Sequence, residues 1–312
     1  MRSEQDVSLG AEFDRPTREQ WLTLVDKVLA GAPFERKLVS HTYDDLAIQP
    51  LYTATNVTGS ATAPPSFPVD APFPRGRSAT GGAVGGWDIR QHHAGTDLAA
   101  LNEAILTDLA GGVTSIELGP IISADRSAAE TEEALGRALQ GVHLDLAPIC
   151  LDWGNQYDAG ALALESLWER AGIPASSALG EFGADPLGDW STSGNAEVPD
   201  LSDALTLAVR VAGRYGDGVA ALRVDGLHYA NAGASDAQEL AFATATGIAY
   251  LRGLTQSGLS IDVALGQIVF RLAATTDSSR QPRNCGPRVA CGHASRKHGG
   301  PRRLPAACAS RR

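Results

Sequence analysis

The sequence has few cysteines, and they are unevenly distributed. Of the four, Cys285, Cys291 and Cys308 lie in the last 35 residues, and only Cys150 lies in the rest of the chain. A body with one cysteine has no disulfide framework, which is typical of a protein from a reducing compartment. There is no apolar run of membrane length and the N-terminus is polar, so we expect a cytoplasmic protein without a membrane partner.

Basic residues are also scarce in the body of the chain. Residues 1–277 hold 17 Lys and Arg against 36 Asp and Glu, a net charge of −19, whereas residues 278–312 hold nine basic residues and no acidic ones. Binding to nucleic acid phosphates needs a basic surface. The acidic body therefore argues against a nucleic-acid partner.

No dinucleotide-binding or phosphate-binding glycine motif is present. The run "GGAVGG" (81–86) is not G-x-G-x-x-G, and no Lys-Ser/Thr follows it, so a flexible strap is favoured over a phosphate cradle. Five prolines between Pro64 and Pro74 also exclude regular structure there. With an amphipathic helix predicted over 17–30, residues 1–84 are interpreted as an N-terminal arm and strap.

Helices and strands are predicted to alternate from residue 97 onward. Such alternation indicates right-handed crossovers and a parallel sheet. Strands are expected within 113–119, 141–150, 175–185, 219–227 and 264–274. The spacing favours an α/β fold of the TIM type, a (β/α)8 barrel, and the absence of a glycine fingerprint disfavours a dinucleotide fold. Because eight strands close such a barrel, we expect residues 85–277 to form an incomplete one with about five strands.

The last segment, residues 278–312, differs in composition from the rest. Of its 35 residues, 25 are Arg, Pro, Ala, Gly or Ser, so we expect it to be disordered. Its Cys and His residues have spacings that fit no structural zinc motif, and we expect no metal site. A basic nucleic-acid arm has no support elsewhere in the chain. Our hypothesis is that the chain is truncated and translated out of frame after Asp277.

The stretch "GGWDIRQHHAG" (85–95) is a dense group of polar side chains. In an extended segment, Asp88, Arg90 and His92 would share one face. An Arg for an anionic group beside a His acid/base would make a plausible site. The alternative is a surface Asp–Arg pair with solvated histidines, and composition alone favours this alternative.

His228 is a second candidate, because it follows a predicted strand at the end where barrel enzymes hold their active sites. For His228 the sequence favours neither a functional nor a structural role over the other. Trp153, Trp168 and Trp190 are predicted to be packing residues.

Several motifs resemble the methylmalonyl-CoA mutase family. They are "PLYTATN" (50–56), "GGWDIRQHHAG" (85–95) and "LHYANAGASDAQELAFATATGIAYLRGL" (227–254), and the similarity runs in order through most of residues 17–277. The resemblance implies a (β/α)8 barrel with an N-terminal extension and a C-terminal cobalamin domain. It also implies that CoA lies along the barrel axis under adenosylcobalamin, and that the reaction interconverts methylmalonyl-CoA and succinyl-CoA.

The sequence departs from the active chains of that family, whose motifs read roughly R-P-W-T-I-R-Q-Y and G-Y-H-M-x-E. Gly85 replaces the Arg that contacts CoA, Asp88 replaces a Thr, and His92 replaces the Tyr that lies over the substrate. Around the site His, Leu227 replaces a Tyr and Asn231 replaces a Glu. These five positions are lost family positions.

Arg90, Gln91 and His228 are retained, and the resemblance makes them vestigial substrate-binding positions, with no residue assigned as catalytic. This combination is similar to the small subunits of the heterodimeric bacterial members, which support a catalytic large (alpha) subunit. That resemblance implies that the large subunit binds adenosylcobalamin and acyl-CoA, and that this chain binds no cofactor. Two alternatives stay open: an independently active acyl-CoA mutase that uses His92, and a non-enzymatic assembly protein of the same fold.

Overall fold

The computed structural model describes residues 13–14, 16–53, 88–122, 127–274 and the backbone of 308–310. The chain divides into two compact units, Met1–Pro64 and Pro65–Arg312. Among the described helices, none combines the length and the apolar character needed to cross a membrane. The predicted strap and most of the tail lie outside the described residues.

The described residues of the first unit, 13–14 and 16–53, form two helices and a small hairpin. They are α1 (Arg18–Leu29), α2 (Phe34–Leu38), and the antiparallel pair β1 (Ser40–His41) and β2 (Ala47–Ile48). The helix predicted over 17–30 is thus present. It begins where the Thr17 side chain accepts from the Gln20 backbone N–H while the Gln20 side chain accepts from the Thr17 N–H, a reciprocal cap that satisfies two free donors.

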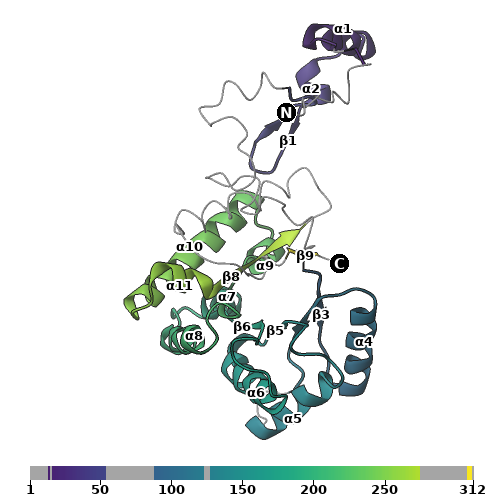
Figure 1. The fold of residues 1–312 in the computed structure, drawn as a ribbon. Coiled ribbons are helices and arrows are strands. Elements are labelled where there is room, and N and C mark those ends of the chain that lie inside the picture. Colours follow the sequence, from purple (N-terminus) through teal and green to yellow (C-terminus); the bar gives the residue numbers. More distant parts are fainter. Residues whose placement is uncertain (1–12, 15, 54–87, 123–126, 275–307, 311–312) are drawn as a thin grey trace, which may run out of the picture. The chain divides into compact units, whose positions relative to one another are not determined.

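The second unit is an α/β sheet in which every neighbouring pair of strands is parallel (Figure 1). In sheet order the strands are β3 (Arg90–His93), β4 (Ser115–Leu118), β5 (Ile149–Leu151), β6 (Gly180–Ala184), β7 (Val219–Asp225), β8 (Ile268–Ala274) and the short β9 (Cys308–Ser310). The intervening helices are α4 (Leu98–Ala110), α5 (Ala128–Ala138), η1 (Gly154–Gln156), α6 (Tyr157–Arg170), α7 (Pro186–Ser193), α8 (Ser202–Tyr215), α9 (Leu227–Asn231), α10 (Asp236–Gln256) and α11 (Ile261–Gly266).

The sheet curls like part of a barrel. Arg90 on β3 reaches Glu181 on β6, although two strands lie between them, with 3.1 Å between Nη1 and Oε2. Arg271 on β8 reaches Glu117 on β4 across three strands, with 2.8 Å between Nη1 and Oε1. A flat sheet with strands about 4.8 Å apart would place such residues too far apart for contact. The predicted incomplete TIM-type barrel is therefore confirmed.

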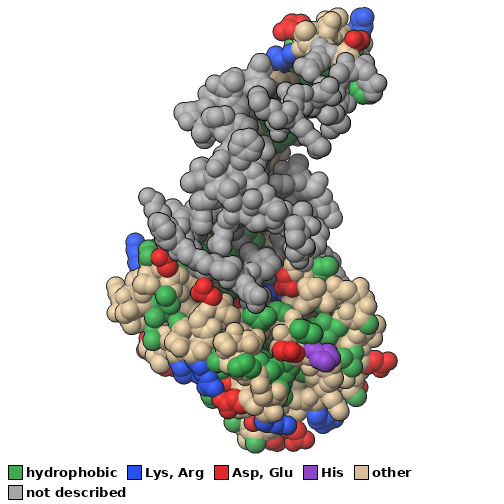
Figure 2. Space-filling model, in the orientation of Figure 1, with side chains coloured by type: hydrophobic (Ala, Val, Ile, Leu, Met, Phe, Trp, Pro, Cys, Tyr) green, Lys and Arg blue, Asp and Glu red, His purple; other side chains and the backbone are tan. Residues whose placement is uncertain are grey.

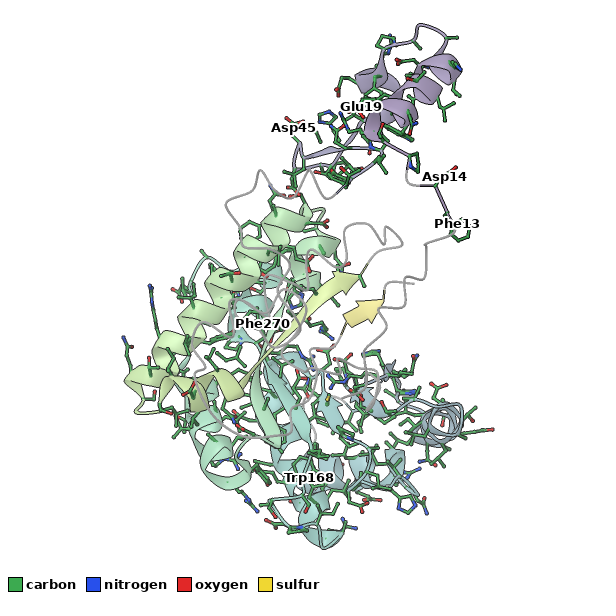
Figure 3. All side chains as sticks on the ribbon, turned by 45° about the horizontal axis from the view of Figure 1, so that its top comes forward. Phe13, Asp14, Glu19, Asp45, Trp168 and Phe270 are labelled. Atoms are coloured by element: carbon green, nitrogen blue, oxygen red, sulfur yellow. The ribbon has the colours of Figure 1, made fainter. Side chains whose placement is uncertain are left out.

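The hydrophobic core lies between the sheet and its helices. Along each strand, every second side chain points away from the concave side of the sheet and toward the helices. Ile116, Leu118 and Phe182 are such residues, and they are completely buried. Trp168 of α6 (Figure 3) packs against Phe182 and Tyr215, with ring centroids 6.0 and 5.6 Å apart. Trp153 and Trp168 are buried packing residues as predicted, and Trp190 is half-buried.

Two strand predictions need correction. Strand β3 is present in addition to the predicted strands. It was not predicted because its sequence, Arg-Gln-His-His, has no alternation of apolar and polar residues. The strand predicted over 141–150 is confined to Ile149–Leu151. Pro148 has no backbone N–H to donate to a neighbouring strand. Leu144 and Ala147, which precede it, are buried although they lie in turns and not in a strand.

In the tail, only the backbone of Cys308–Ser310 is described, and it pairs in parallel with β8. The predicted disorder and altered reading frame of residues 278–312 stay predictions.

Candidate functional site

Polar side chains line the concave, interior face of the half-barrel. The six strands β3 to β8 contribute Arg90, Glu117, Cys150, Glu181, Arg223 and Arg271, and all of these except Cys150 are charged. In an ordinary TIM barrel this layer is filled mainly by Val, Ile and Leu. The interior is therefore held by charge pairing rather than by apolar packing.

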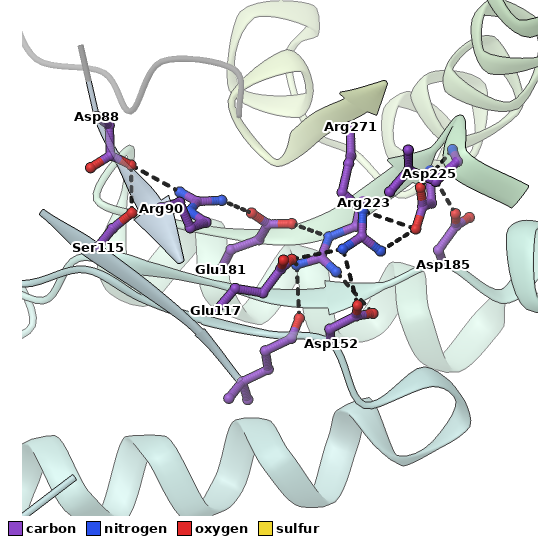
Figure 4. A network of polar contacts seen from close by, with 12 residues as sticks. Asp88, Arg90, Ser115, Glu117, Asp152, Glu181, Asp185, Arg223, Asp225 and Arg271 are labelled. Carbon is purple, nitrogen blue, oxygen red and sulfur yellow. Dashed lines mark hydrogen bonds and ion pairs between the residues drawn. The ribbon is translucent and has the colours of Figure 1, made fainter. Parts of the chain in front are cut away.

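Arg223 lies at the centre of this network (Figure 4). Its side chain is only 2% exposed, and its guanidinium lies 2.5 Å from Glu181, 3.1 Å from Glu117 and 3.0 Å from Asp152. Its Nη2 also donates to the Leu151 carbonyl oxygen at 2.8 Å. Burial opposes the positive charge, but the surrounding carboxylates outweigh it and raise the pKa of Arg223 well above its ordinary value.

Arg271 forms a second junction beside Arg223. Its Nη1 lies 2.8 Å from Glu117 and 3.0 Å from Asp152, and its Nε donates to Asp225 at 2.9 Å. Burial alone would raise the pKa of Asp152, but the two guanidinium groups dominate and lower it. Asp152 is therefore a carboxylate held in its charged form by the network.

Asp88 and Arg90 of the sequence motif form the other end of the network. Arg90 donates to Glu181 and, from Nε, to Ser115 Oγ, at 3.1 Å in both cases. Asp88 accepts from Ser115 Oγ at 2.6 Å and lies 3.5 Å from Arg90. The Arg90 side chain is 8% exposed, so the pair is buried in the interior and is not the surface pair considered from composition.

The network carries more negative than positive charge. Its three arginines face five carboxylates, which are Asp88, Glu117, Asp152, Glu181 and Asp225. Every one of these guanidinium groups is already paired with protein carboxylates. On the side of the second unit drawn in Figure 2, charged side chains of both signs are scattered among hydrophobic ones. None of these three arginines is therefore free to bind an anionic ligand in the interior.

His92, Glu117 and Asp152 have their ligand atoms within 4.8 Å of one another, the one such His and carboxylate group among the described residues. Both carboxylates, however, are bonded to Arg223 and Arg271. A divalent cation there would be repelled by two guanidinium groups about 3 Å from its ligand oxygens. The donor set does not fit a metal ion.

His228 lies on α9 at the C-terminal end of the strands, among buried carboxyl groups. Its Nε2 is 3.8 Å from Asp225 Oδ2, beyond hydrogen-bond distance. Nearby, Asp185 accepts from Tyr250 Oη at 2.6 Å and from the Asp225 N–H at 2.8 Å. Burial and the charge of Asp185 raise the pKa of Asp189 to about 6. This end of the half-barrel is acidic.

The residues singled out from the sequence separate into three groups. Asp88 and Arg90 join the interior network, and His92 lies beside it. Gln91 is half-buried on the opposite side of β3 from Arg90, since side chains alternate along a strand. The α9 residues, including Leu227 and Asn231, lie at the C-terminal end with His228. Gly85 lies outside the described residues.

Glu117, Glu181, Arg223 and Arg271 are functional-site residues that were not predicted from the sequence. A signal was nevertheless present, because each is a charged residue inside an otherwise apolar strand, as in "VAALRVD" and "IVFRLAA". Burial of such a charge requires a partner of opposite sign, and several such strands in one sheet predict that they pair.

Comparisons with known proteins agree with this architecture. The family model described as methylmalonyl-CoA mutase matches residues 41–280. The chain is 42% identical, over 87% of its length, to the methylmalonyl-CoA mutase small subunit of Streptomyces virginiae, and covers 43% of that protein. It is 34% identical, over 87% of its length, to the small subunit of Propionibacterium freudenreichii subsp. shermanii, and covers 42% of it.

A methylmalonyl-CoA mutase large subunit, also from Streptomyces virginiae, is more distant. It is 24% identical over 85% of the chain, which covers 38% of that protein. The chain thus spans less than half the length of the curated relatives it matches. The barrel architecture, the family model and the identity to both small subunits together show that this chain belongs to the methylmalonyl-CoA mutase family.

Proposed function

We propose that this chain acts as a supporting, non-catalytic small subunit of an adenosylcobalamin-dependent methylmalonyl-CoA mutase of the cytoplasm. In that complex a large subunit would interconvert methylmalonyl-CoA and succinyl-CoA, and this chain would stabilise it. The two relatives with the higher identities are both named small subunits, and one comes from an organism that also has a large subunit.

The interior ion-pair network is the observation that carries the proposal. In the active chains that the sequence resembles, CoA lies along the barrel axis. Here Arg223 and Arg271 occupy the interior face and bond to Glu117, Asp152 and Asp225. Acyl-CoA carries phosphates and, in this reaction, a carboxylate. A net negative interior would repel such an anion, and it offers no free guanidinium to bind it.

Residues of the family motifs, whether retained or replaced, also have protein partners. Arg90, the retained Arg of the first motif, is bound to Glu181 and Ser115. Asp88, which replaces a Thr, accepts hydrogen bonds from Thr114 and Ser115. These contacts join the β3 segment to β4 and, through Glu181, to β6. His228 lies among carboxylates, at a site without the Tyr and Glu that flank the matching His of active chains.

The described residues do not fit adenosylcobalamin. The cofactor supplies the radical chemistry of this reaction, while the protein shields and positions the substrate. The C-terminal end of the half-barrel is lined by the carboxyl groups of Asp185, Asp189 and Asp225. We therefore assign the cofactor to the large subunit and derive no step through it for this chain.

Reconstitution with the large subunit of the same organism tests the proposal. Succinyl-CoA formation is measured with adenosylcobalamin for this chain, for the large subunit, and for both together. We expect no turnover by this chain, with or without His92→Tyr, because the interior arginines stay paired with the chain's own carboxylates and are not free to bind acyl-CoA. We expect more turnover by the pair than by the large subunit alone. Turnover by this chain alone would favour the independently active mutase. A large subunit unaffected by the chain would favour the assembly protein.

A further inference from the structure

Helix α7 carries two acidic side chains one turn apart at the C-terminal end of the half-barrel. Asp185 immediately precedes the helix and caps its first turn, because its Oδ1 accepts from the Gly188 N–H at 3.0 Å. Asp189 lies one turn further along, on the same side of the helix, and like charges at this spacing repel each other. Asp185 is buried and Asp189 is half-buried. The pair therefore places two carboxyl groups, largely withdrawn from water, close together.

Hydrogen bonds support a negative charge on Asp185 but not on Asp189. Besides the bond from Gly188, Asp185 accepts from Tyr250 Oη at 2.6 Å and from the Asp225 N–H at 2.8 Å. Asp189 Oδ2 is buried and, among the described residues, has no hydrogen-bond partner. Burial raises the pKa of both carboxyl groups, and hydrogen bonds oppose this rise only at Asp185. A carboxylate that has lost water without gaining a donor is costly, so Asp189 is the acid of this pair that favours a bound proton.

Besides Asp185, titratable groups from five surrounding elements interact with Asp189. They are Asp152 after β5, Tyr157 on α6, Asp225 on β7, His228 on α9 and Tyr250 on α10. The two aspartates oppose a negative charge on Asp189, although Arg271 already pairs with both of them (Figure 4). The two tyrosines stay neutral, since burial raises the pKa of each. Of these five groups, His228 can carry a positive charge, which would favour ionisation of Asp189.

Asp189 lies where α7 meets its neighbours. A Cβ at Gly154 of η1 would be 3.7 Å from both carboxyl oxygens of Asp189, so the acid rests on the η1 backbone. A Cβ at Gly188 would be 3.0 Å from His228 Cδ2, so α7 also packs against α9. Asp189 further lines a pocket of about 600 Å³, together with residues of η1 and of the segment that follows α7. This pocket gives water, and hence protons, a route to the carboxyl group.

We propose that proton binding to Asp189 controls how firmly α7 is held against η1 and α9. With the proton bound, α7 packs with a neutral carboxyl group at the contact. Once Asp189 is ionised, its unpaired charge makes local opening of α7 easier, because the carboxylate regains water when the helix moves away. The result is a pH-sensitive hold on the C-terminal end of the half-barrel, the end at which barrel enzymes carry their active sites.

The direction of the pH effect follows from the pKa of Asp189 in the packed and in the opened helix. In packed α7, burial and then the charge of Asp185 raise this pKa to about 6. In opened α7, the carboxyl group regains water and its pKa returns to about 4. Packed α7 therefore binds more protons than opened α7 between these two values. The hold on α7 is strongest below about pH 4, weakens as the pH rises to about 6, and is constant above that.

Hydrogen exchange at the α7 amides of the full chain measures this hold. The opening constant, corrected for intrinsic exchange rates, is compared with that of α8 in the same sample. We expect the α7 constant, relative to that of α8, to be about three- to tenfold larger at about pH 7.5 than at about pH 5, a range reduced for the partial exposure of Asp189. Asp189→Asn cannot ionise, so its constant should stay low at both pH values. The control Glu197→Gln removes an exposed carboxylate that lines the same pocket, and we expect it to keep the wild-type change.

The variant His228→Gln separates Asp189 from the neighbouring imidazole. Loss of the positive charge should move the pH dependence of α7 opening to higher pH without abolishing it. A pH dependence that disappears in His228→Gln would assign the proton to the imidazole and overturn the inference. A wild-type opening constant that is the same at both pH values would also overturn it, as would an Asp189→Asn variant with the wild-type change. If Asp189→Asn does not fold, the wild type and His228→Gln still decide between these outcomes.

Discussion

Replacement of Arg223 by Met is expected to lower the free energy of unfolding of the chain by about 3–5 kcal/mol, since it removes one partner of a buried charge network. Arg223 is 2% exposed and neutralises Glu117, Asp152 and Glu181. Methionine fills similar space but leaves these carboxylates with too little positive charge. Domains are commonly stable by only about 5–15 kcal/mol, so the loss is a large part of the total.

Denaturant unfolding of the full chain measures this loss. The matched control is Arg170→Met, which breaks an ion pair with Glu132 whose side chains are 65% and 27% exposed. We expect the control to cost less than about 1 kcal/mol. The loss in the Arg223 variant should shrink in acid, because the unpaired carboxylates can then take up protons. Equal stability of the two variants near neutral pH would contradict a structural role for the network.

Replacement of Gly183 by Ala is expected to cost about 3 kcal/mol or more, through backbone strain and overlap. Gly183 has φ of +70°, and a Cβ there would lie 2.1 Å from the Leu151 carbonyl oxygen and 3.3 Å from Arg223 Cζ. The register of β6 against β7 also shifts between Glu181 and Ala184. This irregularity brings the backbone close to β5 and makes room for the Arg223 guanidinium.

Gly213→Ala on α8 is the matched control. Gly213 lies within a helix and has no positive φ, and no atom lies within 4 Å of the position that an alanine methyl group would take. Alanine there should stabilise the chain by about 0.5–1 kcal/mol. Thermal unfolding of both variants separates the two effects. A Gly183 variant as stable as the wild type would show that the close approach of β5, β6 and Arg223 is not needed.

The sequence was sufficient to predict the class of fold, because the strands after residue 97 are mostly apolar and alternate with capped helices. Capping residues such as Ser127 and Ser235 mark helix starts in both the sequence and the structure. Strand β3 was not predicted as one of the barrel strands, since its four residues are polar and become a strand only through pairing with β4. Pairing with β4, and not the local sequence pattern, determines that this segment is a strand.

The candidate site was predictable only in part, for a related reason. The motif residues Asp88, Arg90 and His92 were visible because they are close in sequence. Their partners were not, since Arg90 and Glu181 are 91 positions apart. Contacts across the interior of a barrel depend on how far the sheet curls, and a single sequence does not state that curvature. The resemblance to the family predicts which positions are lost, and the geometry adds what Arg90, Arg223 and Arg271 bind.

Calorimetric titration with methylmalonyl-CoA shows whether the interior face of this chain binds an acyl-CoA. We expect no saturable heat for the folded chain, because the arginines of the interior are already paired with the chain's own carboxylates. The large subunit titrated in the same buffer should bind the ligand. Saturable binding to this chain that is lost in Arg90→Met would contradict the account, because it would place an acyl-CoA site on the very residues that the network occupies.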